Sequence, residues 1–166
     1  MRNFILSSVL FVALNLVSVG NASANGFQAD PAVACDFLAQ EGLRTRGGYQ
    51  GSGDIHRCSS RRRNVISGGG INNSIRFVAQ GYAQTVRQLR LELQVNSLSG
   101  VQRAHRTLAE HAMSLTKKAL GVDMPGEIEA AILSAVPGTW SVNSSTVTLE
   151  RIVAGAAGYE LRFRIQ

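Results

Sequence analysis

The chain contains 166 residues, of which 45% are hydrophobic and 17% are charged, and its formal net charge is +6. This length suits one domain and argues against a second, because a chain of this size can bury most of its unfolded surface in a single core. The positive charge is compatible with an anionic partner. It is also ordinary for solubility, so charge alone assigns no function.

Residues 1–24 have the pattern of a secretory signal peptide. Arg2 supplies a positive charge, residues 4–19 are mostly apolar, and Ala22-Ser23-Ala24 matches the small-x-small pattern that a signal peptidase accepts. An uncleaved anchor would need about 20 strongly apolar residues, whereas this stretch is shorter and interrupted by polar groups. We therefore expect cleavage after Ala24, a periplasmic or secreted mature domain over residues 25–166, and no membrane span after cleavage.

The mature part contains both cysteines of the chain, Cys35 and Cys58. In an oxidising compartment such a pair most simply forms one disulfide, which would close a loop of about 24 residues and stabilise the fold by about 3 kcal/mol. The alternative is a reactive or metal-bound thiol. Neither cysteine belongs to a C-x-x-C pair and no histidine lies at ligand spacing, so we predict a Cys35–Cys58 bridge that holds down a basic loop.

The first expected helix begins at Asp30-Pro31 and stops near Gly42, with Asp30 as N-cap and Pro31 at the first helical position. Residues 44–70 are rich in Gly, Ser and Arg, which is a loop composition. Two strands follow at 75–80 and 89–95, because apolar and polar residues alternate there with period two. Their short connection favours antiparallel pairing.

Ser99 and Gln102 match a capping box and predict a helix over residues 100–120 that stops at Gly121. Its apolar residues fall in one stripe, so this helix should face a core. A shorter helix should begin at Pro125 and end at 137–138.

The last third returns to strands around Trp140, 147–149 and 159–165. The expected fold is therefore α+β, with an antiparallel sheet of about five strands and helices packed on one face.

Three histidines are candidates for chemistry. His105 and His111 share the long helix, but six residues place them about 120° apart, so they should not share a metal ion; each should lie at the stripe border with one nitrogen solvated. His56 lies near Asp54 and several serines, and a hydrolytic pair is conceivable there. The serines lie in no nucleophile-elbow context, so we assign no catalytic residue.

Arginine placement carries the functional hypothesis. One group lies beside Cys58 in the expected loop: Arg57, Arg61, Arg62 and Arg63. A second group occupies the outward positions of the predicted strands: Arg76, Arg90, Arg162 and Arg164. If these strands are neighbours, the second group would form a guanidinium array able to hold phosphate or carboxylate groups bidentately. The alternative is a solvated face, because Glu92 and Glu160 belong to it and would neutralise part of it.

A pattern of structural residues also suggests a family. Cys35-x-x-Leu38, Gly42-Leu43, Cys58-Ser59 and the paired strands ending at Val95-Asn96 resemble small exported proteobacterial proteins grouped as a domain of unknown function. The resemblance implies a bacterial envelope setting and assigns no catalytic residue.

We therefore expect an exported, non-enzymatic module that engages an anionic envelope component or a protein partner through its arginines. Two alternatives stay open: a small hydrolase using His56 with Asp54, and an accessory or chaperone of a secretion system, which rests on architecture alone. No metal or cofactor is expected, because no ligand pattern occurs. No nucleic acid is expected either, because no aromatic residue is interleaved with the outward arginines.

Overall fold

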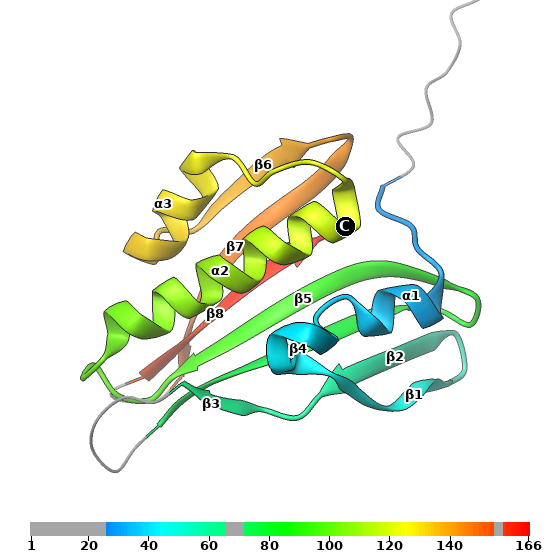
Figure 1. Cartoon of the computed structure of the whole chain (residues 1–166), viewed down its shortest axis with the longest axis horizontal. Helices are drawn as coiled ribbons and strands as arrows, with labels where there is room; N and C mark the ends of the chain where they lie inside the picture. Colours follow the sequence, from blue (N-terminus) through cyan, green and yellow to red (C-terminus); the bar gives the residue numbers. More distant parts are fainter. Residues whose placement is uncertain (1–25, 66–71, 155–157) are drawn as a thin grey trace, which may run out of the picture.

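The structure is a computed structural model that describes residues 26–65, 72–154 and 158–166 (Figure 1). The predicted signal peptide and the glycine run 68–70 lie outside these residues.

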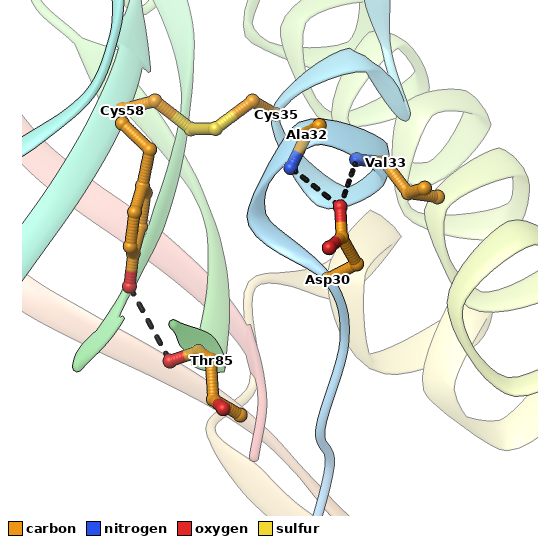
Figure 2. The surroundings of a disulfide bond; sticks show 7 residues. Asp30, Ala32, Val33, Cys35, Cys58 and Thr85 are labelled. Carbon is orange, nitrogen blue, oxygen red and sulfur yellow. Dashed lines mark hydrogen bonds between the residues drawn. A yellow bond between two sulfur atoms is a disulfide. The ribbon is translucent and has the colours of Figure 1, made fainter. Parts of the chain in front are cut away.

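The first helical elements of the described residues are α1 (Pro31–Asp36) and a π-helical turn, η1 (Ala39–Leu43). Asp30 Oδ1 accepts hydrogen bonds from the backbone nitrogens of Ala32 at 2.8 Å and Val33 at 3.2 Å, as Figure 2 shows. The predicted N-cap is therefore confirmed. Gly42 has a φ of 80°, which a residue without a Cβ adopts readily, and it falls at the end of η1.

The prediction of a loop over residues 44–70 is wrong for most of that segment. It contains β1 (Thr45–Ser52), β2 (Ile55–Ser60) and β3 (Arg63–Val65). Glycines suggested a loop, but here they allow a hairpin: Gly47 and Gly48 have positive φ at the register shift of β1. Gly51 lies against the facing strand, where a Cβ would be 2.0 Å from the Ile55 carbonyl oxygen.

The remaining strands are β4 (Asn73–Tyr82), β5 (Thr85–Val95), β6 (Gly138–Val142), β7 (Ser145–Ala154) and β8 (Gly158–Ile165). They form one antiparallel sheet in the order β1-β2-β4-β5-β8-β7-β6, with β3 paired to β4 beside β2. The α+β fold and the antiparallel pairing of β4 with β5 are confirmed. Over the described ranges the sheet has eight strands, which corrects the expected five.

Helices α2 (Val101–Leu120) and α3 (Gly126–Ser134) lie with α1 on one face of the sheet (Figure 1). Gly100, in a left-handed conformation, occupies the N-cap of α2, so the prediction of Ser99 as N-cap is wrong. Gly121 ends α2 as predicted. In the described ranges, no helix combines the length and apolar character needed to cross a bilayer.

The core lies between these helices and the sheet. It contains the inward residues of the central strands and the apolar stripe of α2: Ile75, Phe77, Leu89, Leu91, Leu93, Leu161, Phe163, Ala104, Leu108, Ala112 and Leu115. Alternation along β4, β5 and β8 therefore places the charged residues on the opposite face of the sheet, which Val78 of β4 shares with them.

The predicted disulfide is confirmed. Cys35 of α1 and Cys58 of β2 are bonded, with their Cα atoms 6.0 Å apart (Figure 2). Both residues are buried. The bridge joins a helix to a strand of the sheet and does not tie down a loop, because residues 55–60 are a strand.

Candidate anion-binding site

The sheet face opposite the helices, called here the open face, brings the four outward arginines together. Pairing places Arg76 beside Glu92, Glu92 beside Arg162, and Arg162 beside Glu150, across four strands. The next row places Arg90 beside Arg164. Positive and negative side chains thus alternate along the first row, which is the favourable arrangement for cross-strand neighbours, whereas the second row places two arginines side by side.

Glu92 lies at the centre of this arrangement, and only 2% of its side chain is exposed. Its carboxylate accepts a hydrogen bond from Arg76, and it lies 3.3 Å from Arg62 Nη2 and 2.7 Å from Arg90 Nε. Burial alone would raise the pKa of Glu92, but the hydrogen bond from Arg76 and the surrounding guanidinium charges hold that pKa below its ordinary value. Glu92 is therefore ionised, and its negative charge interacts with the positive charges of three arginines.

The other two glutamates of the open face pair with the remaining arginines. Glu160 lies 2.5 Å from Arg162 Nε and 3.6 Å from Arg62 Nη2. Glu150 accepts a hydrogen bond from Arg164. The part of the open face over β5, β8 and β7 is therefore an ion-pair lattice, with its arginines already engaged by carboxylates of the same chain.

The β1–β2 end of the sheet differs. A hollow of about 270 Å³, called here the arginine hollow, is lined by Gly42, Arg44, Arg46, Ser60, Arg61, Arg62 and Arg63. No acidic side chain belongs to this lining. Arg44, Arg46 and Arg61 are exposed, and none of them forms an ion pair with another residue in the described part of the chain. These three guanidinium groups are therefore the uncompensated positive charges of the site.

The structure keeps Arg61, Arg62 and Arg63 at one hollow, although their side chains point to different partners, and separates Arg57 from them. Arg61 lines the hollow, and Arg62 reaches over the open face to Glu92. Arg57 lies opposite Gln80 and lines a different depression, with Gln50 and Ile55.

Arg63 turns toward the helices. Its Nη1 donates to the Glu41 carbonyl oxygen at 2.8 Å, and its Nη2 lies 3.0 Å from His111 Nε2. Since the His111 Nδ1–H donates to the Thr107 carbonyl at 2.7 Å, Nε2 is the acceptor for Arg63. Desolvation, together with the charge of Arg63, lowers the pKa of His111 and keeps the ring neutral. Arg63 is thus a fixed wall of the hollow.

Both helical histidines correct the expectation of one solvated nitrogen. His105 is buried, with Nδ1 2.9 Å from the Leu133 carbonyl oxygen and Nε2 2.7 Å from the Tyr159 hydroxyl. His111 is buried and bonded through both nitrogens as well. Within residues 26–65, 72–154 and 158–166, no three His, Cys, Asp or Glu side chains gather closely enough to hold a metal ion.

His56 and Asp54 are not brought into a catalytic arrangement. The His56 ring stacks on Tyr49 with the ring centroids 5.9 Å apart, and its Nδ1 is buried without a hydrogen-bond partner among the described residues. Asp54 is exposed in the turn between β1 and β2. In the part of the chain that the structure describes, no hydrogen bond or ion pair joins the two side chains.

Sequence reasoning missed Arg44 and Arg46. The signal was present, because two arginines separated by one residue share a face if the segment is a strand. The loop composition of residues 44–70 hid that strand.

Fold and site together define an α+β protein whose helix-free sheet face is charged and ends in an arginine-lined hollow. Comparison of the chain with protein-family models, with curated proteins and with solved structures finds no match. The resemblance to exported proteobacterial proteins stays a prediction.

Proposed function

We propose that this chain is an exported, non-enzymatic module of the bacterial envelope that engages an anionic envelope component through the arginine hollow. The signal-peptide pattern and the disulfide support export, because disulfides persist in oxidising compartments. The resemblance to exported proteobacterial proteins agrees with this setting.

The observation that carries the proposal is the unequal charge of the two ends of the sheet. Over β5, β8 and β7, glutamates of the chain pair with the arginines. At the hollow, Arg44, Arg46 and Arg61 have no such partners in the described ranges. Clustered uncompensated charges of one sign attract a partner of the opposite sign and speed its encounter.

The experiment measures retention of the mature, disulfide-bonded chain on an immobilised polyanion as the salt concentration rises. The test variant is Arg44→Ala/Arg46→Ala/Arg61→Ala. Arg62 and Arg63 are left unchanged, because their loss would disturb Glu92 and His111 as well. The matched control is Arg87→Ala/Arg103→Ala/Arg106→Ala, which removes the same net charge from exposed positions outside the hollow.

We expect the wild type and the control to elute at similar salt concentrations and the hollow variant to elute well before both. The electrostatic origin predicts weaker retention as salt increases, because exposed charges are screened. Equal shifts for the two variants would mean that net charge alone causes retention. Absence of wild-type retention at low salt would refute the proposal.

A further inference from the structure

The arginine hollow is small, and every charged side chain in its lining is an arginine. Its volume of about 270 Å³ is just below the range of roughly 300–1,000 Å³ that accommodates whole drug-sized ligands. The Ser60 hydroxyl is already engaged, since it donates to the Arg61 carbonyl at 3.0 Å and accepts from Phe77 N at 2.9 Å. A ligand in the hollow therefore presents one compact group to arginines, and the rest of it lies outside.

Two walls of the hollow are fixed before any ligand enters. Arg62 is held by Glu92 and Glu160, and Arg63 by Glu41 and His111. Gly42 allows this packing, because a Cβ there would lie 2.5 Å from Arg63 Nη1. Fixed walls beside three exposed, unpaired arginines lower the entropic cost of binding a compact anion.

The number of unpaired guanidinium groups in the hollow indicates which chemical class of ligand fits it. A carboxylate carries one charge and has two acceptor oxygens, which one bidentate arginine can engage and which several arginines can share, as at Glu92. A phosphate monoester carries a charge of about −1.5 to −2 at neutral pH and has three terminal acceptor oxygens. Arg44, Arg46 and Arg61 offer three planar forks with no acidic residue in the lining, one fork for each terminal oxygen of the monoester, and a monoester offsets more of their three positive charges than a carboxylate does.

We infer that the arginine hollow binds a terminal phosphate group, held by the forks of Arg44, Arg46 and Arg61. This inference rests on the proposed function and names its ligand chemistry. A phosphate monoester can be part of a lipid headgroup or of a soluble molecule, and the experiment distinguishes these sources.

The probes are inorganic phosphate and glycerol phosphate by titration calorimetry, with acetate for comparison. Phosphatidylcholine vesicles containing either phosphatidic acid, a monoester, or phosphatidylglycerol, a diester, test the lipid source. The pH is 8, where the phosphate is dianionic, since its second pKa is about 6.

The decisive variant is Arg44→Lys/Arg46→Lys/Arg61→Lys, which retains the charge and removes the forks. We expect it to keep wild-type retention on the polyanion and to lose roughly tenfold or more in affinity for phosphate, because an ammonium group cannot reproduce bidentate pairing. Binding of the soluble phosphates supports a soluble source. Binding only to phosphatidic acid vesicles supports a lipid headgroup.

Equal affinity for acetate and phosphate would overturn the inference, as would unchanged phosphate affinity in the lysine variant. In both cases, retained binding to the polyanion would leave the proposed function standing. If the wild type is not retained on the polyanion at all, the proposed function itself is refuted. Circular dichroism of the lysine variant, compared with that of the wild type, establishes that both are folded.

Discussion

At the scale of single residues, His111 joins the helical layer to the wall of the arginine hollow. Its ring is buried in α2, donates from Nδ1 to Thr107 and accepts at Nε2 from Arg63. Protonation would place a second N–H opposite an arginine N–H and add charge in a buried position. The folded state therefore favours the neutral ring, which is why the pKa of His111 is lowered.

This lowered pKa predicts a pH dependence of stability. The unfolded chain binds the proton more readily, with a pKa of about 6.5, so the contribution of His111 is complete above that pH. It is lost progressively as the pH falls from about 6.5 through the folded pKa. We expect the free energy of unfolding in urea to be lower at pH 5.5 than at pH 7.5. His111→Gln should reduce this difference; an unchanged difference in that variant would assign the effect to another group.

Glu92 shows where residue-level reading of a sequence reaches its limit. Period-two alternation placed Glu92 on the same face as Arg76 and Arg90, and that face holds them. Arg62 also reaches Glu92, from a segment that separates β2 and β3. That contact depends on strand order and register across the sheet, which the local pattern does not contain.

At the scale of elements, predictability follows the strength of the periodic signal. Strands β4, β5 and β8 bury one full face under the helices, so their apolar residues recur with period two, most regularly in β5 and β8, and could be recognised. The β1–β2 hairpin could not be recognised from its sequence. It has glycines at the register shift and at the close approach to Ile55, where a typical strand has apolar side chains, and glycine is also typical of loops.

A substitution at Gly51 tests whether the hairpin requires the close approach of β1 to β2. A Cβ at residue 51 would lie 2.0 Å from the Ile55 carbonyl oxygen and 2.6 Å from the His56 Cα, which are backbone atoms that can move only with the strand. We expect Gly51→Ala to lower the free energy of unfolding by roughly 1–3 kcal/mol, as steric overpacking does. Since β1 carries Arg46, the variant should also bind anions more weakly.

Gly126→Ala is the matched control for this prediction. It makes the same chemical change in the first turn of α3, where a Cβ meets nothing within 4 Å. Alanine has the higher helix propensity, so we expect a neutral or slightly stabilising effect. A Gly51→Ala variant as stable as Gly126→Ala would contradict the tight packing of the hairpin.

At the scale of the whole molecule, the charged surface and the disulfide depend on different parts of the chain. The ion-pair lattice forms wherever the sheet folds, because it joins side chains of neighbouring strands. The Cys35–Cys58 bridge, by contrast, needs an oxidising compartment, because cytosolic thiols are kept reduced. Export would therefore contribute to stability as well as location: it permits the bond that joins α1 to β2, next to the strand that carries Arg46.

This dependence makes the predicted signal peptide testable through the state of the cysteines. Expressed in a bacterium from residue 1, the chain should be found in the periplasmic fraction with Asn25 as its first residue and no free thiol, measured by intact mass after alkylation. A version starting at Asn25 should remain reduced in the cytoplasm. Its free energy of unfolding should be about 3 kcal/mol lower than that of the oxidised protein. Oxidation should restore that stability in the wild type but not in Cys35→Ser/Cys58→Ser. Recovery of the chain in the membrane fraction with Met1 intact would mean that residues 1–24 act as an uncleaved anchor.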